Sequence, residues 1–437
     1  MKVLNKKESV AITTLGCRSN QYDTSAIEEL LTVEGYDLVH FSEHADVYII
    51  NTCTVTNKTD YQSRQLIRKV RKINAEAVII VTGCYAQVSA DEVSKIDGVD
   101  HVLGNPDKAK IIDCIVEGRS SEGSRSRVSD YKAGTPFTLR AAAFKGRTRA
   151  NLKIQDGCNR KCAFCIIPMA RGVSKSVKEA DVLREIEAMV QTGFKEIVFT
   201  GIHLGAFGAD QADKSLTTLL REVVKEKFPM RVRLSSLDPD EVTDELIELI
   251  GSSDSICNHL HLPIQSGDDK ILKLMRRPYS TVELEEKIMR VYNGIKDVSI
   301  GTDVIGGFPG EGEAEFNNTL ALLKELPFSY MHVFPYSKRD GTVAALMPDH
   351  LNGKIIKERC AKMREVDMIK CKEFHESYIG KNLKVLFESK VGSDGRIKGR
   401  SGNYITAFME KGNVTPGDKG ELLNVKVCNA TEEGVFC

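Results

Sequence analysis

The sequence predicts an α/β protein with an open parallel α/β domain at the N-terminus, a partial barrel of six β/α units in the centre and a small β-barrel at the C-terminus. Three observations predict this fold class. The chain has 437 residues, which is more than one ordinary core accommodates. Strand-like apolar runs alternate with helical patterns over most of it. The C-terminal end, about sixty residues, has only short alternating runs separated by Gly and Asn turns.

The pattern of residues 1–117 predicts the N-terminal α/β domain. The runs SVAITTLGC, DVYIINTC and AVIIVTGC are rich in Val and Ile, and a helical pattern follows each of them. Each run ends on a cysteine, namely Cys17, Cys53 and Cys84. The carboxyl ends of parallel strands meet at one edge of a sheet, so we expect these cysteines to converge on a metal site. The alternative is that they are small buried side chains of the core.

The rest of the chain divides in three. Residues 118–149 are rich in Ser, Gly and Arg and predict a linker. Residues 150–375 return to the strand and helix alternation with six strand-like runs, which predict a partial barrel with its active site at the carboxyl ends of the strands. Residues 376–437 predict the small C-terminal β-barrel.

A second group of three cysteines follows the first barrel strand. The segment DGCNRKCAFCIIPMARG spaces Cys158, Cys162 and Cys165 as CxxxCxxC. A structural zinc site needs four ligands, and this segment offers no second pair. An iron–sulphur cube held by three thiolates leaves one iron open to another ligand, and S-adenosylmethionine can chelate it through its amino and carboxylate groups. The remaining cysteines show no such pattern and are expected to be core or incidental thiols: Cys114, Cys257, Cys360, Cys371, Cys428 and Cys437.

Composition excludes some classes of protein. Lys plus Arg and Asp plus Glu both number 61, so any surface for nucleic acid must be a local patch. The sequence shows no run of eighteen apolar residues and no signal peptide, so we expect a cytosolic protein with no membrane partner. In that reducing compartment, clustered cysteines indicate metal ligands or catalytic thiols.

Basic residues gather in two segments. Lys58–Lys72 has six basic residues against one acidic, and Arg140–Lys153 has five against none. Such runs are commonly solvated surface, but their position beside Cys53 and Cys158 favours contacts with phosphate. The expected RNA contacts there are Arg64, Arg68, Arg147 and Arg149.

The C-terminal segment GRIKGRSGNYITAF offers a further RNA contact. It spaces Arg396, Lys398, Arg400 and Tyr404 at alternating positions. One strand face with a stacking aromatic is expected, and a solvated strand face is the equal alternative.

These motifs resemble the radical S-adenosylmethionine superfamily and, within it, the methylthiotransferases. The resemblance rests on CNRKCAFC, on TLGCRSNQYDT, INTCTVTN and VTGCYAQ, and on LHLPIQSGDDKILKLMRRPYS and DVIGGFPGE, and it covers essentially the whole chain. The C-terminal part is similar to a TRAM RNA-binding domain. NTCTVT with the basic helix after it most resembles the branch that acts on threonylcarbamoyladenosine in tRNA. The branches acting on isopentenyladenosine or on a ribosomal-protein aspartate carry different residues there.

The resemblance implies two 4Fe–4S clusters. Cys158, Cys162 and Cys165 would hold the one that generates a radical from S-adenosylmethionine. Cys17, Cys53 and Cys84 would hold an auxiliary cluster that carries the sulphur.

The implied reaction replaces the C2 hydrogen of the adenosine just 3′ of the anticodon with a methylthio group and uses two molecules of S-adenosylmethionine. The implied partners are a tRNA anticodon stem-loop, an electron donor and a sulphur donor. C2 is an unactivated carbon, so a radical route is needed. One alternative is a methylthiotransferase that acts on isopentenyladenosine in tRNA or on a ribosomal-protein aspartate. Another is a metal-stabilised RNA-binding protein without catalysis, which predicts closed sites of four ligands.

Residues near the predicted strand ends are expected to line the S-adenosylmethionine pocket. Glycine-rich turns let the backbone approach a ligand closely, although they also occur as ordinary tight turns, and single polar residues are often structural. The expected contacts are Phe164, Gly201, His203, Ser235, Ser236, Gln265, Asp303, Gly306, Gly307 and Tyr336. The sequence departs from the usual family residues at Arg18, Ser19, Met169 and Gly312, none of which is an expected cluster ligand.

Overall fold

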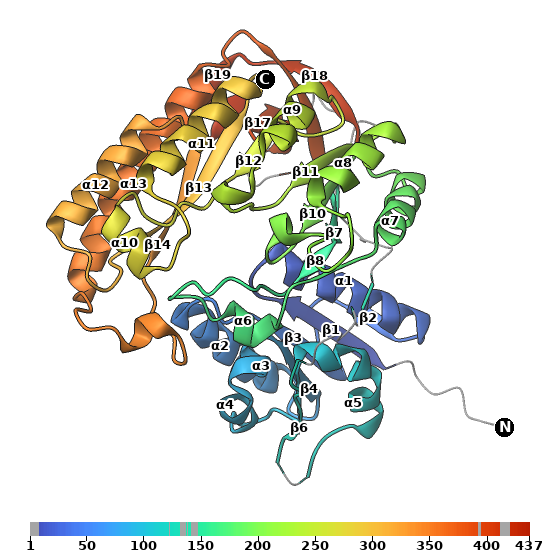
Figure 1. Ribbon diagram of the computed structural model, residues 1–437. Helices are drawn as coiled ribbons and strands as arrows, with labels where there is room; N and C mark the ends of the chain where they lie inside the picture. The colour runs from blue at the N-terminus through green and yellow to red at the C-terminus, as the bar shows by residue number, and fades with distance from the viewer. Residues whose placement is uncertain are drawn as a thin grey trace.

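The computed structural model describes residues 8–121, 123–131, 137, 139–140, 147–391, 395–410 and 420–437. It has an N-terminal parallel sheet, a central set of parallel strands surrounded by helices, and a C-terminal sheet (Figure 1). The expected fold class is therefore confirmed. Within the described residues, no helix is both long enough and apolar enough to cross a membrane.

The N-terminal sheet has six parallel strands in the order β2-β1-β3-β4-β5-β6. All six residues of β3 are buried, because helices cover both faces of the sheet. The segment expected to be a linker contributes the edge strand β6, which pairs with β5; much of its remainder lies outside the described residues. The elements are β1 (Ser9–Thr14), α1 (Arg18–Val33), β2 (Asp37–Val39), β3 (Val47–Thr52), α2 (Asn57–Ile73), β4 (Val78–Gly83), α3 (Cys84–Val88), α4 (Ala90–Ser94), β5 (His101–Leu103), η1 (Asn105–Lys110), α5 (Ile111–Glu117) and β6 (Arg125–Arg127).

The central region contains six parallel strands that follow one another in chain order. They are β7 (Ala150–Lys153), β10 (Glu196–Thr200), β11 (Arg231–Leu234), β12 (His259–His261), β13 (Ser299–Gly306) and β14 (Tyr330–Pro335). Backbone hydrogen bonds from Val232 to Ser255 (2.7 Å) and from Leu237 to His261 (3.0 Å) join the β7–β10–β11 half to the β12–β13–β14 half. The partial barrel expected from the sequence is therefore present.

Helices cover the outside of these strands. Ser215, Thr243 and Ser280 each accept a hydrogen bond from a backbone N–H in the first turn of the following helix, which fixes where that helix begins. The remaining elements of this region are β8 (Gln155–Asp156), α6 (Ile167–Arg171), β9 (Lys175–Ser176), α7 (Glu179–Gln191), η2 (Leu204–Ala206), α8 (Leu216–Lys225), η3 (Pro239–Glu241), α9 (Asp244–Ser252), α10 (Asp269–Leu274), α11 (Thr281–Gly294), α12 (Glu313–Glu325), η4 (Val343–Leu346) and α13 (Gly353–Glu376).

The two faces of the barrel strands differ in polarity. Outward residues such as Ile197, Val232 and Leu260 join the main apolar core beneath the helices. The residues that alternate with them point to the inner face and are largely polar or aromatic, because successive side chains of a strand face opposite ways. The inward set is Asn151, Lys153, Glu196, Arg231, Arg233, His259, His261, Asp303, Tyr330 and His332.

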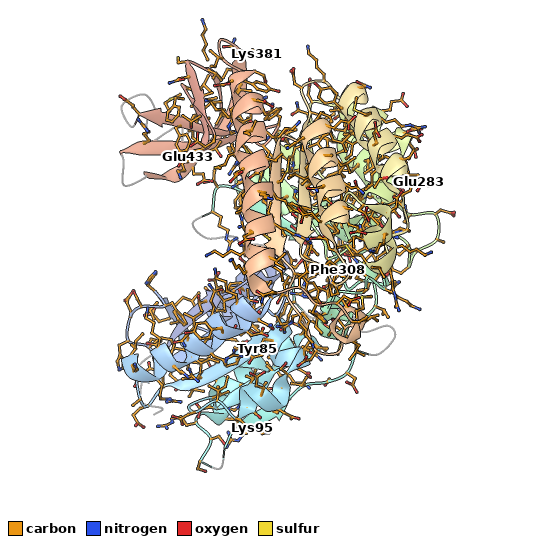
Figure 2. All side chains as sticks on the ribbon, turned by 90° about the vertical axis from the view of Figure 1, so that its left-hand side faces the viewer. Tyr85, Lys95, Glu283, Phe308, Lys381 and Glu433 are labelled. Atoms are coloured by element: carbon orange, nitrogen blue, oxygen red, sulfur yellow. The ribbon has the colours of Figure 1, made fainter. Side chains whose placement is uncertain are left out.

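The C-terminal sheet follows the long helix α13, which Figure 2 shows rising past the barrel towards Lys381. Its order is β18-β15-β16-β17-β20-β19, antiparallel except for the β17–β20 pair. Val385, Phe387, Ile397 and Val435 belong to its core. The strands are β15 (Asn382–Val391), β16 (Arg396–Ser401), β17 (Thr406–Glu410), β18 (Leu422–Lys426), β19 (Asn429–Thr431) and β20 (Gly434–Phe436).

Two buried arginines of β11 attach the barrel to the C-terminal sheet. Arg231 donates to the carbonyls of Lys384 (3.1 Å) and Arg400 (2.7 Å), and Arg233 donates to those of Ser401 and Gly402 (both 2.8 Å). Both arginines also donate to the fully buried carboxylate of Glu196, each through Nε at 2.7 Å.

Burial by itself raises the pKa of Glu196, but Arg233 and Arg231 outweigh that effect and lower the pKa to about 2. The ionised carboxylate thus contributes stability above its ordinary pKa of 4.5, and this contribution disappears as the pH falls towards 2.

We predict that Glu196→Gln destabilises the apoprotein by about 3–5 kcal/mol at neutral pH, because two buried guanidinium groups lose their counter-charge. Thermal unfolding followed by circular dichroism should show a lower midpoint, and the gap to the wild type should narrow as the pH falls from 4.5 to about 2. Glu388→Gln, at a carboxylate 40% exposed, is the control and should change little. Equal midpoints at neutral pH would contradict this account.

Candidate active site

The three N-terminal cysteines lie at one edge of the sheet. Cys17 precedes α1, Cys53 follows β3 and Cys84 begins α3, and the strands that lead to them, β1, β3 and β4, are neighbours. Burial, together with the nearby Cys84 and Cys17, raises the pKa of Cys53 to about 12. Gly16 has φ +99° and approaches Cys53 so closely that a Cβ at Gly16 would lie 2.7 Å from the Sγ. Glycine at that position therefore lets the Cys17 loop close over Cys53.

The CxxxCxxC segment forms the loop between β8 and α6. Burial, together with Cys162 and Cys158, raises the pKa of Cys165 to about 12. Cys162 accepts a hydrogen bond from Arg277 at 3.4 Å, and the same arginine donates to Asp238 at 2.6 Å. The loop is therefore fastened to the opposite side of the barrel by an arginine that the sequence did not single out.

His203 lies beside this loop. Its Nε2 is 2.5 Å from Glu241, and its backbone N–H donates to Gln155 Oε1 at 2.7 Å. Burial lowers the pKa of His203, but the neighbouring Cys158 and Glu241 outweigh burial and raise the pKa to about 10. The imidazolium therefore places a positive charge next to the Cys158 sulphur.

Both cysteine groups suit iron–sulphur clusters. All twelve cysteines are free, so none of the six in these two groups forms a disulphide. In each group the neighbouring thiols help to raise the pKa of one member, Cys53 in the first group and Cys165 in the second, because thiolates crowded in a buried place repel. A cluster supplies the positive iron that allows all three thiolates of a group to form.

Three buried polar atoms near the loop lack a hydrogen-bond partner among the described residues. They are Nδ1 of His203, Oγ of Ser235 and the hydroxyl of Tyr336. Buried polar groups are normally satisfied, so these atoms are suited to a polar ligand. Ser236, the neighbour of Ser235, is exposed.

The other expected cofactor contacts have structural partners. Phe164 packs edge-to-face on Phe308, with ring centroids 6.5 Å apart. Gln265 has φ +69°, and its N–H donates to the Asp303 carbonyl at 2.9 Å. Any Cβ at the glycines of this region would clash: Gly201 with Gln155 (2.8 Å), Gly306 with Cys360 (2.9 Å) and Gly307 with Ile356 (2.5 Å). Gly306 and Gly307 therefore allow α13 to pack closely against the end of β13.

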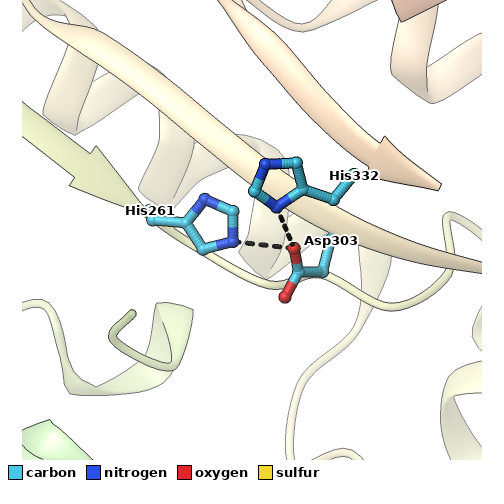
Figure 3. A group of neighbouring side chains, drawn as sticks. All are labelled: His261, Asp303 and His332. Atoms are coloured by element: carbon cyan, nitrogen blue, oxygen red, sulfur yellow. Dashed lines mark hydrogen bonds and ion pairs between the residues drawn. The ribbon is translucent and has the colours of Figure 1, made fainter. Parts of the chain in front are cut away.

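Asp303 is held by two histidines of the inner face (Figure 3). Its Oδ1 is 2.8 Å from His261 Nε2 and 3.1 Å from His332 Nδ1. Burial raises the pKa of Asp303, but His261 and His332 outweigh burial and hold the pKa well below its ordinary range. The ligand atoms lie within 4.8 Å of one another, as a cation site requires, but the hydrogen bonds account for the arrangement without a metal.

A buried ionic network lies between the two cysteine groups. Asp23 of α1 pairs with Lys108 at 2.6 Å and with Lys153, and Asp156 of β8 pairs with Lys153 and Arg171, both at 3.1 Å. Arg171 also lies 3.3 Å from Asp23, and its side chain is only 1% exposed. Burial by itself would lower the pKa of Arg171, but Asp156 and the nearby Cys84 keep it well above its ordinary value.

Asn105 links the two cysteine groups beside this network. Asn105 contacts Cys84 Sγ at 3.8 Å and donates to the Ala170 carbonyl at 2.7 Å. Ala170 and Arg171 belong to α6, which begins two residues after Cys165. The structure therefore places the N-terminal cysteines against the helix that follows the CxxxCxxC loop.

The expected RNA contacts occupy different environments. Arg68 and Arg147 are exposed, and Arg147 donates to Gln21 at 2.9 Å. Arg64 is engaged by Glu92 at 2.9 Å, and Arg149 by Glu388 at 3.3 Å.

The prediction that Arg400 and Tyr404 share one strand face is wrong in one respect. Arg396, Lys398 and Arg400 alternate on β16, but Tyr404 lies in the turn after it, with φ +67°. Its ring stacks on His259 of the barrel, with centroids 4.4 Å apart. The turn Gly402–Asn403 ends the strand before Tyr404, and the barrel offers an aromatic partner.

The four departures from the usual family residues have defined surroundings. Arg18 donates to the Tyr404 hydroxyl at 3.2 Å. Ser19 is 1% exposed and Met169 is 51% exposed. Gly312 precedes α12, and its N–H donates to Glu315 at 2.8 Å.

Two parts of the chain match known protein families. Residues 9–104 match the uncharacterized protein family UPF0004, and residues 152–323 match the radical SAM superfamily. The radical S-adenosylmethionine methyltransferase TsrM from Kitasatospora setae aligns with a TM-score of 0.54 over 89% of this chain and 82% of its own, at 14% identity, which supports the fold alone. The partial barrel, the CxxxCxxC loop and the match to the radical SAM superfamily together define this protein as a radical S-adenosylmethionine enzyme.

Two relatives narrow this class. The threonylcarbamoyladenosine tRNA methylthiotransferase MtaB of Bacillus subtilis is 41% identical over 97% of this chain and 94% of its own length. A tRNA-2-methylthio-N(6)-dimethylallyladenosine synthase of Fusobacterium nucleatum is 33% identical over 96% of this chain and 97% of its own. The chain belongs to the radical S-adenosylmethionine methylthiotransferase family, whose cofactors are S-adenosylmethionine and 4Fe–4S clusters.

We predict that Arg171→Met lowers the stability of the apoprotein by about 3–5 kcal/mol, because Asp23 and Asp156 lose a buried counter-charge. The reconstituted variant should also hold less iron per chain, since Arg171 lies beside the N-terminal cysteines. Arg184→Met, at an arginine 73% exposed, is the matched control. Wild-type stability and iron content in Arg171→Met would show that the network does not join the two sites.

Proposed function

We propose that this protein inserts a methylthio group at C2 of threonylcarbamoyladenosine, next to the anticodon in tRNA. The observation that carries the proposal is the pair of three-cysteine groups brought together across α6. One radical site alone would serve many reactions. A second group of thiols beside it supports insertion of sulphur, and the relative with 41% identity bears the name of this activity.

The cysteines divide between two clusters in this proposal. Cys158, Cys162 and Cys165 hold the cluster that binds S-adenosylmethionine, and Cys17, Cys53 and Cys84 hold the auxiliary cluster. When bound, these groups supply the radical and the sulphur that an unactivated carbon requires. The unpaired polar atoms of His203, Ser235 and Tyr336 support a cofactor pocket beside the loop. Phe164, Gly201, Gln265, Asp303, Gly306 and Gly307 are the further pocket residues that we propose.

The protein's own side chains position and shield this chemistry. Arg277 holds the CxxxCxxC loop through Cys162, and His203 places a positive charge near Cys158. Gln155 donates to the Gly157 carbonyl at 2.8 Å and fixes the start of the loop. Arg171 gives positive charge to the thiolates of the N-terminal group, which favours their ionised form.

The proposed RNA contacts divide by exposure. Arg68 and Arg147 are exposed on the surface, where phosphate can reach them, and Arg64 and Arg149 lie near them in the chain. Arg400 and Tyr404 belong to the C-terminal domain, which we propose to be a TRAM domain.

The division of the chain and its partners complete the proposal. We propose domains at residues 1–117, 150–375 and 376–437, with a connecting segment at 118–149. We also propose a cytoplasmic location, an electron donor and a sulphur donor.

The proposal is tested by mass spectrometry of nucleosides from anticodon stem-loops incubated anaerobically with reconstituted protein, dithionite, sulphide and S-adenosylmethionine. We expect the threonylcarbamoyladenosine nucleoside to gain the mass of a methylthio group and the isopentenyladenosine nucleoside to remain unchanged. A gain only on isopentenyladenosine would move the protein to the other tRNA branch. A gain on neither, with S-adenosylmethionine still cleaved, would rule out both.

Two cysteine variants separate the clusters. Cys158→Ala should abolish reductive cleavage of S-adenosylmethionine to 5′-deoxyadenosine, because its loop loses one of three ligands. Cys53→Ala should still cleave the cofactor but form no methylthio product. Cys257→Ala, at a buried cysteine outside both groups, is the control and should keep both activities. Full methylthiolation by Cys53→Ala would refute the role of the auxiliary group.

A further inference from the structure

Tyr404 lies among positively charged side chains from three parts of the chain. Arg18 of α1 donates to its hydroxyl at 3.2 Å. The guanidinium carbons of Arg233 and Arg400 lie 5.1 Å and 4.4 Å from the centre of its ring. Burial by itself would raise the pKa of Tyr404, but Arg18 and Arg400 outweigh burial and lower it.

Carboxylates do not balance these charges. Glu196 is shared by Arg231 and Arg233, and Glu388 pairs with Arg149. Within the described residues, neither Arg18 nor Arg400 forms an ion pair. Arg400 instead donates to neutral oxygens, the Tyr404 carbonyl at 2.9 Å and the Thr406 hydroxyl at 2.8 Å. Five guanidinium groups therefore share two carboxylates, and such a surplus favours an anionic ligand.

Arg18 is the member of this group that adjoins an expected cluster ligand in the chain. It follows Cys17 directly in the chain, at the first position of α1. Its charge also reaches Tyr330 and His259 on the inner face of the barrel. That face is open to solvent on β14, where His332 is 55% exposed and Phe334 is 41% exposed. A ligand on the inner face thus has Arg18 on one side and aromatic rings on the other.

We propose that Arg18 binds the carboxylate on the N6 substituent of the target adenosine. This inference rests on the proposed function. N6 and C2 lie on the same edge of adenine, so a group attached to N6 stays near C2. The side chain that binds its carboxylate must then lie beside the cluster from which sulphur is inserted, as Arg18 does after Cys17. An isopentenyl substituent carries no carboxylate, so Arg18 selects the acidic nucleoside over the apolar one.

A phosphate of the RNA backbone is the other oxyanion that this charge would attract. The two sources differ in one measurable respect. A carboxylate contact depends on the N6 substituent, whereas a phosphate contact is present in every RNA. Binding to two RNAs that differ only in that substituent therefore distinguishes them.

The experiment measures dissociation constants of reconstituted protein for an anticodon stem-loop with threonylcarbamoyladenosine and for the same stem-loop with plain adenosine. The wild type should prefer the modified RNA. Arg18→Gln should lose about tenfold or more of its affinity for the modified RNA and little for the plain one, because a charge-assisted hydrogen bond disappears. Arg18→Lys should keep part of the preference. Arg184→Gln, at an exposed arginine of α7, is the control, and iron content should match the wild type in all variants.

Three results would overturn the proposal. An equal loss for both RNAs would assign Arg18 to a phosphate. An unchanged preference in Arg18→Gln would show that another group binds the substituent. A wild type without preference would exclude a carboxylate contact altogether. Because the wild-type mass gain on threonylcarbamoyladenosine is measured separately, a failure of the proposed reaction is distinguishable from a failure of the Arg18 contact.

Discussion

The relative position of the two cysteine groups depends on the buried ionic network of Asp23, Lys108, Lys153, Asp156 and Arg171. Its members come from α1, η1, β7, β8 and α6, so they join the N-terminal sheet to the first barrel strand. Burying charges is costly, and apolar packing would stabilise the same contact at least as well. Ion pairs fix direction as well as distance, which apolar contacts do not. We infer that the network is retained because it sets how the two sites face each other.

Buried ion pairs also attach the C-terminal sheet to the inner face of the barrel. Arg231 and Arg233 are held by Glu196 and donate to backbone carbonyls of the C-terminal sheet. The C-terminal domain thereby brings Tyr404 against His259. The inner face is thus bounded by all three parts of the chain, and a surplus of positive charge surrounds Tyr404. Such a surface suits a polar, anionic substrate better than an apolar one.

Two glycines determine how closely neighbouring loops and helices approach the strand ends. Gly16 allows the Cys17 loop to reach Cys53, and Gly307 allows α13 to pack on the end of β13. Both have positive φ, a backbone conformation that other residues rarely adopt. The cysteine sites are therefore built on tight turns at strand ends, where the backbone is held by the sheet on one side and by a helix on the other.

The sequence by itself determined the parallel α/β rhythm, the partial barrel and the two groups of three cysteines, because strand periodicity and ligand spacing are local properties. It also indicated the family, through motifs that lie in those same loops. Only the tertiary structure decided that Tyr404 leaves its strand and stacks on His259, that Arg171 lies between the cysteine groups, and that Arg18 meets a hydroxyl 386 residues further along the chain. These contacts depend on how separate domains dock. Docking is set by buried charge pairs between distant segments, which no local pattern encodes.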